Sequence, residues 1–218
     1  NAMGVNKIHP EDFTTLGYTG GGSPVWTVRE DAPYNKLSDL VSALKAKPKS
    51  LIEVVGIGTI PHLVGVQLTA AAGIQTRLMG SGGGADRLAR VLGKNADIAL
   101  FSAAGYLKNK PSGIKALVFF GPKRIPAIAD IPTAKELGYD VVWANPASWL
   151  APKGLPKDIA AKLAGALKAA VQSKEITDWY VKNTLDPYWT DSDAALADSL
   201  AVLEGLRKVV KDNNITKK

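Results

Sequence analysis

The sequence contains no cysteine and only two histidines among its 218 residues. The absence of cysteine excludes disulfide bonds, thiolate nucleophiles and cysteine-ligated metal sites. It fits an oxidising compartment, where free thiols are a liability, although many cytosolic proteins also contain none. His9 lies near the start of the chain and His62 lies in a glycine-rich stretch far from it, so the two are not expected to share a metal ion. We predict neither a metal site nor a cofactor.

Long apolar runs and dense clusters of charge are also scarce. No apolar run approaches the roughly 20 residues that a membrane-spanning helix needs, so we expect the chain as given to be soluble. The net charge is +7, but the only dense basic run is Lys217–Lys218, and no basic stripe alternates with aromatic residues. We therefore expect a solvated basic surface with a mild attraction for anions, and no nucleic acid partner. Asn1 and Ala2, which precede Met3, are interpreted as an addition ahead of a start methionine.

The hydrophobic pattern alternates between strand-like and helix-like segments through the middle of the chain. Predicted strands cover Thr14–Leu16, Val25–Val28, Leu51–Val55, Ile74–Met79, Ala96–Phe101, Lys115–Phe120, Val141–Trp143 and Ser148–Leu150. Predicted helices cover Leu37–Leu44, Pro61–Ala72, Ala85–Leu92, Leu155–Gln172, Glu175–Lys182 and Ala194–Lys211. Gly20–Gly22 is interpreted as a glycine-rich joint, either between the first two strands or within one interrupted strand. Thr133 and Glu136 have capping-box spacing, which predicts one further short helix. The alternation indicates an α/β layer fold with a mainly parallel sheet, followed by a helical remainder.

Two glycine-rich segments follow predicted strands and precede predicted helices. In Gly56-Ile57-Gly58-Thr59-Ile60-Pro61-His62, the glycines allow close approach to the backbone and Thr59 is a candidate N-cap. Ser81-Gly82-Gly83-Gly84 repeats this arrangement after the next strand. Amides at a helix start favour anions, and ligands bind at the carboxyl edge of open α/β sheets. We therefore expect the two loops to lie side by side and to form one anion site, although each could instead be an ordinary tight turn.

Other interpretations of these motifs fit less well. The first loop contains neither the third glycine of a dinucleotide-binding fingerprint nor an acidic residue about 20 positions later, and no Gly-Lys-Ser/Thr follows either loop. No GxSxG motif supports a hydrolase triad. His62 is either a ligand contact or a structural hydrogen-bonding residue. Asp86 and Asp97 are expected to be solvated or to cap helices. An α/β transferase would need a base or metal constellation that is not found, so we predict that the protein is not an enzyme.

Several segments together resemble the substrate-binding proteins of tripartite tricarboxylate transporters, the TctC or Bug family. They occur in the family's order and spacing from about Asp12 to the carboxyl end. The quoted segments are GIGTIPHLVGVQLTAAAGI, GSGGGADRLARVLGKNADIAL, IKALVFF, KRIPAIADIPTAKELGYDVV and SWLAPKGLPKDIAAKLAGAL. The resemblance implies an α/β fold of the periplasmic-binding-protein-like type II, or Venus-flytrap, class. It predicts one complete lobe plus a partial second lobe.

The resemblance also implies which residues contact ligand. The family's ligand loop corresponds to Gly56, Gly58, Thr59 and His62, and the following loop corresponds to Ser81, Gly82 and Gly83. Ser102, after the strand that ends at Phe101, is a further candidate for a hydroxyl contact. The sequence departs from the family at Met79 and Gly80, where a Pro-Tyr pair is usual, and in beginning after the family's opening βα segment.

The function implied is capture of a small organic carboxylate for presentation to the membrane permease subunits of the transporter, in the periplasm. The expected domains are residues 12–32 as a partial first lobe with hinge strands, 33–145 as a complete ligand-binding lobe, and 146–218 as the helical part of the first lobe. The alternative is a sensor or partner-binding module without transport. Because an incomplete lobe exposes apolar surface, a homodimer is also expected.

Overall fold

The computed structural model describes residues 7–212, so the predictions for Asn1, Ala2 and Lys217–Lys218 fall outside the described residues. These residues form two compact units. One unit is Ser23–Ala144, and the other combines the described residues up to Gly22 with those from Asn145 onwards. The chain therefore passes between the units twice.

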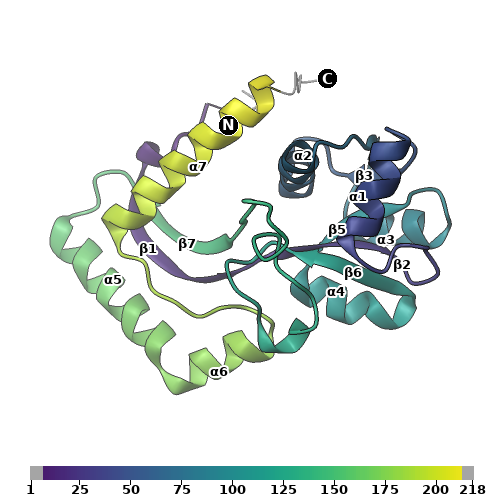
Figure 1. The fold of residues 1–218 in the computed structure, drawn as a ribbon. Coiled ribbons are helices and arrows are strands. Elements are labelled where there is room, and N and C mark those ends of the chain that lie inside the picture. Colours follow the sequence, from purple (N-terminus) through teal and green to yellow (C-terminus); the bar gives the residue numbers. More distant parts are fainter. Residues whose placement is uncertain (1–6, 213–218) are drawn as a thin grey trace. The chain divides into compact units, whose positions relative to one another are not determined.

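A five-stranded sheet organises the Ser23–Ala144 unit, in the order β4-β3-β5-β2-β6 (Figure 1). Its strands are β2 (Pro24–Arg29), β3 (Ile52–Val55), β4 (Arg77–Gly80), β5 (Ile98–Ser102) and β6 (Ile114–Phe119). Its helices are α1 (Leu37–Ala46), α2 (Ile60–Ala72), α3 (Gly84–Leu92) and α4 (Ala103–Asn109), with 3-10 turns η2 (Lys110–Ser112) and η3 (Pro126–Ile128). Strand β3 is parallel to β4 and β5, whereas β2 is antiparallel to β5 and β6. The sheet is therefore mixed, and the prediction of a mainly parallel sheet holds only for the three strands β4, β3 and β5.

Helices cover both faces of this sheet because successive strand residues point to opposite sides. In β5, Ile98 and Leu100 join a core cluster with residues of α1 and α2. The alternate residues Ala99 and Phe101 join a second cluster with residues of α3 and α4. This two-sided burial explains why β5 reads in the sequence as a continuous apolar run.

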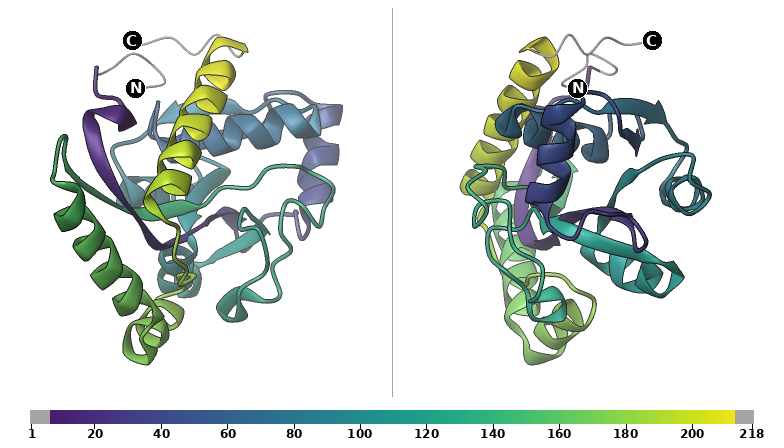
Figure 2. Two further views of the ribbon diagram at one scale, coloured as in Figure 1. Left: turned by 90° about the vertical axis from the view of Figure 1, so that its left-hand side faces the viewer. Right: turned by 45° about the vertical axis from the view of Figure 1, so that its right-hand side comes forward.

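The other unit has a two-stranded antiparallel sheet, which pairs β1 (Phe13–Gly22) with β7 (Asn145–Pro152). It also contains η1 (Pro10–Asp12), α5 (Lys157–Gln172), α6 (Lys174–Lys182) and α7 (Ser192–Asp212). Both α5 and α7 pack against β1, and Figure 2 shows these helices beside the strand pair. Tyr18 of β1 fixes α7, because its hydroxyl donates to the Ala195 carbonyl oxygen over 2.8 Å. The described residues from Asn145 onwards are therefore not purely helical, since β7 belongs to this unit.

The sequence predicted a glycine-rich joint at Gly20–Gly22, but these glycines are part of strand β1, and the interruption before β2 lies at Ser23. Gly17 and Gly20 have φ of +141° and +110°, and a Cβ on either would lie 2.5 Å from a backbone oxygen of the segment 186–190. That segment bridges β1 through paired backbone hydrogen bonds between Tyr18 and Thr190 and between Gly21 and Asp186. The extended structure is interrupted at Ser23, and β2 then belongs to the five-stranded sheet of the Ser23–Ala144 unit.

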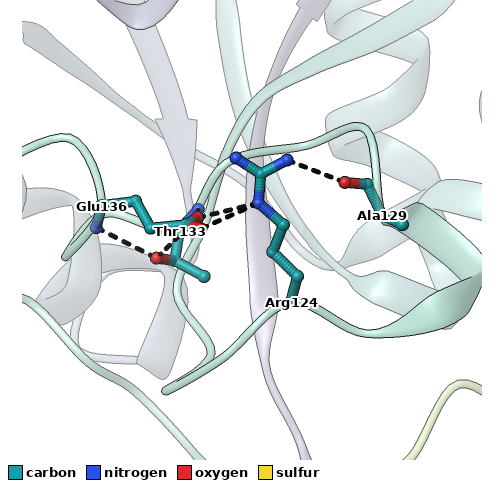
Figure 3. A network of polar contacts seen from close by, with 4 residues as sticks. All are labelled: Arg124, Ala129, Thr133 and Glu136. Atoms are coloured by element: carbon teal, nitrogen blue, oxygen red, sulfur yellow. Dashed lines mark hydrogen bonds and ion pairs between the residues drawn. The ribbon is translucent and has the colours of Figure 1, made fainter.

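The predicted helix at Thr133 is a single turn, although its capping contacts are present (Figure 3). The Thr133 amide donates to Glu136 Oε2 over 2.7 Å, and the Glu136 amide donates to Thr133 Oγ1 over 3.1 Å. Arg124 also binds the Glu136 carboxylate, with its Nε donating to Oε2 over 2.9 Å. The turn does not extend because Ala134 donates its amide to Phe119 of β6 and Gly138 adopts a left-handed φ of +86°.

The structure differs from the sequence prediction at two further elements. Val141–Trp143 is not a strand, although the Trp143 amide donates to the Phe120 carbonyl oxygen over 2.7 Å. Helix α4 was not predicted, because its seven residues show too little apolar periodicity to be seen in the sequence.

Candidate functional site

Three loops leave the carboxyl ends of three adjacent parallel strands. Val55 of β3 pairs with Gly80 of β4, and the Ser81 amide donates to the Val55 carbonyl oxygen over 2.8 Å. The two glycine loops therefore start side by side, as the sequence predicted. Ser102 ends β5, which flanks β3 on its other side. The structure thus brings the loops of all eight predicted site residues to one edge of the sheet.

The first loop is held by contacts among its own residues. Gly58 has φ of +80°, which glycine adopts without strain, and its amide donates to Nδ1 of His62 over 3.0 Å. The Thr59 hydroxyl donates to the Gly56 carbonyl oxygen over 2.6 Å, while Thr59 occupies the predicted N-cap position of α2. His62 is only 2% exposed, and burial lowers its pKa. His62 therefore accepts a hydrogen bond as a neutral imidazole and fixes the shape of the loop.

The second loop leaves its backbone open to approach. An ideal Cβ built on Gly82 or Gly83 would meet no atom within 4 Å. Gly83 is the N-cap of α3 and supplies no side-chain cap, so the first amides of this helix have no side-chain capping partner among the described residues. The Gly82 amide donates to Asp86 Oδ2 over 3.1 Å, and this bond together with the ion pair to Arg90 lowers the Asp86 pKa. The Oγ atom of Ser81 is buried and has no hydrogen-bond partner among the described residues.

The third loop contributes Ser102 as the N-cap of α4. Its Oγ accepts a hydrogen bond from the Gly105 amide over 3.1 Å, and the residue is exposed. An accepting hydroxyl keeps its own proton free to donate. Ser102 can therefore donate a hydrogen bond to an anion at the same edge while it caps the helix.

Sequence reasoning missed Arg87, which lies in the first turns of α3. Its Nε atom is buried without a hydrogen-bond partner among residues 7–212, and its guanidinium carbon lies 5.8 Å from the centre of the Phe101 ring. The sequence carries a weak signal: Asp86 is followed by arginines one and four positions later, and only the latter has the spacing of a helical ion pair. Asp86 does pair with Arg90, with 2.9 Å between Oδ1 and Nε.

The arrangement is suited to holding a small anion. Uncapped amides and the positive end of the α3 dipole favour negative charge, and Arg87 adds a cation beside them. Within the described residues, no three His, Asp or Glu side chains gather closely enough to hold a metal ion.

Comparison with known proteins places the chain in a family. Residues 6–202 match the family described as tripartite tricarboxylate transporter family receptor, TctC. A protein of Cupriavidus necator, described as a UPF0065 protein in the gbd 5′ region, is 26% identical over 190 residues, which are 85% of this chain and 58% of that protein. A UPF0065 protein of Agrobacterium vitis is also 26% identical, over 93% of this chain and 60% of its own length. The chain thus spans about three fifths of these curated relatives.

Solved structures share the fold. A TctC solute-binding protein from Polaromonas superposes with a TM-score of 0.79 at 23% identity, over 97% of this chain and 73% of that one. The periplasmic binding protein BugD superposes with a TM-score of 0.79 at 22% identity, also over 97% of this chain and 73% of that one. A Rhodopseudomonas palustris protein, MatC, solved with malate, gives 0.75 at 18% identity over 96% of this chain and 74% of that one. The α/β fold is of the periplasmic-binding-protein-like type II class, and the chain belongs to the TctC family of tripartite tricarboxylate transporter receptors.

Proposed function

We propose that the protein captures a small organic carboxylate at the edge formed by the loops after β3, β4 and β5, and that it catalyses no reaction. The observation that carries this proposal is the second loop, where Gly82 and Gly83 leave the uncapped start of α3 open to a ligand. Family membership supports it, as do the relatives of this fold that were solved with adipate and with malate. In this proposal Gly56, Gly58, Thr59 and His62 shape one side of the site. Ser81 and Ser102 supply hydroxyls, Gly83 supplies an amide, and Gly82, whose own amide is donated to Asp86, leaves room for the ligand.

Isothermal titration of the full chain with succinate, adipate and malate tests the proposal. Succinamide, which has the same carbon skeleton as succinate without its charges, serves as the matched control ligand. We expect at least one dicarboxylate to bind with a dissociation constant of about 10 μM or tighter and succinamide to bind far more weakly. Equal binding of succinate and succinamide, or no binding of any dicarboxylate, would contradict carboxylate capture.

The partner and the location follow from the same proposal. A transporter receptor delivers its ligand to membrane permease subunits, and the family's proteins work in the periplasm, so we assign both to this chain. Among the described residues, no helix is both long and apolar enough to cross a bilayer. We further propose that the expected lobe 33–145 binds the ligand together with β2, which lies in the sheet of the same unit, and that the expected segments 12–32 up to Gly22 and 146–218 form parts of the other lobe.

A second candidate function is a sensor or partner-binding module that forms a homodimer. It is favoured by the apolar side chains that the unit containing β7 and α5 leaves exposed. Trp149 and Leu150 of β7 are 46% and 49% exposed, and Ile159 and Leu163 of α5 are 44% and 43% exposed. Ligand titration separates the two candidates, because a dimer without carboxylate affinity would support the module alone.

A further inference from the structure

Arg87 forms no ion pair with any acidic side chain of the described residues, although the charge of the adjacent Asp86 favours its charged form. Asp86, the adjacent carboxylate, directs Oδ1 to Arg90 and Oδ2 to the Gly82 amide. The structure shows no ion pair of Arg87 with any described residue, and its Nε has no hydrogen-bond partner within that part of the chain. Two arginines of α3 thus act on the Asp86 carboxylate, but among the described residues only Arg90 forms an ion pair with it.

The position of this guanidinium places it against the open glycine loop. Its Nη2 lies 3.8 Å from the point that a Cβ on Gly84 would occupy, which sets the group against the first turn of α3. The backbone at Gly82 and Gly83, immediately before that turn, has nothing within 4 Å of where side chains would begin. The cation, the uncapped amides and the open backbone therefore belong to the same end of one helix.

The guanidinium is partly desolvated without full compensation. Burial lowers the pKa of Arg87, although an arginine stays charged at any physiological pH. The nearby Phe101 ring compensates little, because 5.8 Å is close to the roughly 6 Å limit of a cation–π contact. A buried donor without an acceptor destabilises the folded chain, and a charged donor does so more strongly. Ser81 Oγ, buried and unpartnered in the same loop, adds a second unmet hydrogen bond.

We infer that Arg87 is a ligand-binding residue that forms an ion pair with one carboxylate of the captured molecule, with Ser81 Oγ donating a hydrogen bond to the same group. This inference rests on the proposed function and deepens it, because it assigns the charge recognition to one side chain. A guanidinium presents paired N–H groups that match the two oxygens of a carboxylate. The site then selects an ionised carboxylate over an amide of the same shape.

The test compares Arg87→Gln with Arg77→Gln by titrating the full chain with succinate, adipate, malate and sulfate. Arg77 is the matched control, because it is an exposed arginine at the amino end of β4, opposite the loops, and its replacement removes the same charge. We expect Arg87→Gln to weaken binding of the preferred dicarboxylate at least tenfold, and Arg77→Gln to change it less than threefold. Arg87→Lys should restore part of the affinity, since it keeps the charge but not the paired geometry.

Thermal melting without ligand separates binding from a structural role. Removing an unpaired, partly buried charge should leave the melting temperature of Arg87→Gln unchanged or raise it. A lower melting temperature with unchanged affinity, or equal affinity in both variants, would overturn the assignment of Arg87 and leave carboxylate capture intact. If the unaltered chain bound sulfate but no dicarboxylate, both the proposed function and this inference would be overturned.

Discussion

At the scale of single residues, glycines in the two units serve different purposes. At Gly17 the positive φ and the Thr190 carbonyl oxygen, 2.5 Å from any Cβ, leave no room for a side chain. At Gly82 a Cβ would meet no atom of the described residues within 4 Å, apart from its two chain neighbours. The first glycine is required for packing, whereas the second leaves room for something outside the chain to approach the backbone.

This contrast yields a paired prediction for Gly82→Val and Gly17→Ala. Gly82→Val should keep the melting temperature of the unaltered chain within a few degrees, because no neighbour is displaced, and should weaken dicarboxylate binding at least tenfold by blocking the amides. Gly17→Ala should lower the free energy of unfolding by about 1–3 kcal/mol or more and leave affinity unchanged where the protein folds. Thermal melting and titration on each variant measure both effects. Full affinity in a well-folded Gly82→Val protein would exclude this loop from the site.

At the scale of elements, strand β3 carries a buried carboxylate beneath helix α2. Glu53 is 1% exposed, and its carboxylate accepts hydrogen bonds from Trp26 Nε1 over 2.9 Å and Thr76 Oγ1 over 3.0 Å. Helix α2 has Gly65 at this point, where a Cβ would collide with the Glu53 carboxylate. Burial raises the pKa of Glu53 from 4.5 to about 7, and the two hydrogen bonds only partly oppose that rise.

We predict that Glu53 makes stability depend on pH. Below pH 4.5 the carboxyl is mostly protonated in both the folded and the unfolded chain, so its full contribution to the free energy of unfolding is present. As the pH rises from 4.5 to about 7, the Glu53 carboxyl ionises in the unfolded chain before it ionises in the folded chain. The free energy of unfolding therefore falls over this range, by on the order of 3 kcal/mol. Glu53→Gln should therefore raise the free energy of unfolding at pH 8 and change it little at pH 4.

Urea denaturation at several pH values measures this, with the exposed Glu175→Gln as the matched control. The control should follow the pH profile of the unaltered chain. A Glu53→Gln profile parallel to that of the unaltered chain would show that Glu53 titrates normally.

The elements that the sequence predicted correctly are those with strong local signals. Helix α2 combines an N-cap at Thr59, a proline in its first turn and a left-handed Gly73 at its end, and it lies within one residue of its predicted bounds. Contacts between distant segments carry no such signal. The β-bridges between β1 and residues 186–190 explain why Gly17 and Gly20 leave no room for a side chain. These bridges join distant segments and are visible only in the folded structure.

The candidate site divides in the same way. Strand-to-helix glycine loops are visible in the sequence, and the shared edge of the sheet follows from parallel pairing. Which side chains pair with one another cannot be predicted from the sequence in this way. Asp86 forms its ion pair with Arg90 and not with Arg87, and His62 accepts a hydrogen bond from the Gly58 amide. Both choices depend on side-chain rotamers, which the sequence spacing alone does not determine.

At the scale of the whole molecule, the exposed apolar residues of α5 predict self-association. Burying Ile159 and Leu163 against a second copy would remove apolar surface from water at about 25 cal/mol per Å². Light scattering should therefore give the mass of a dimer for the unaltered chain and of a monomer for the double variant Ile159→Glu with Leu163→Glu. Lys162→Glu, a neighbouring exposed position on the same helix, is the control and should remain dimeric. A monomer for the unaltered chain would remove the homodimer from the account.

The central claim is that a small carboxylate binds where the loops after β3, β4 and β5 meet. The most direct test is a titration of the ¹⁵N-labelled full chain with succinate, adipate or malate, followed by amide and arginine Nε resonances. We predict saturable shifts at Gly82, Gly83, Gly84 and the Nε of Arg87, with smaller shifts at Gly58 and Ser102. No saturable shift with any of the three acids, or shifts confined to residues outside these loops, would contradict the claim.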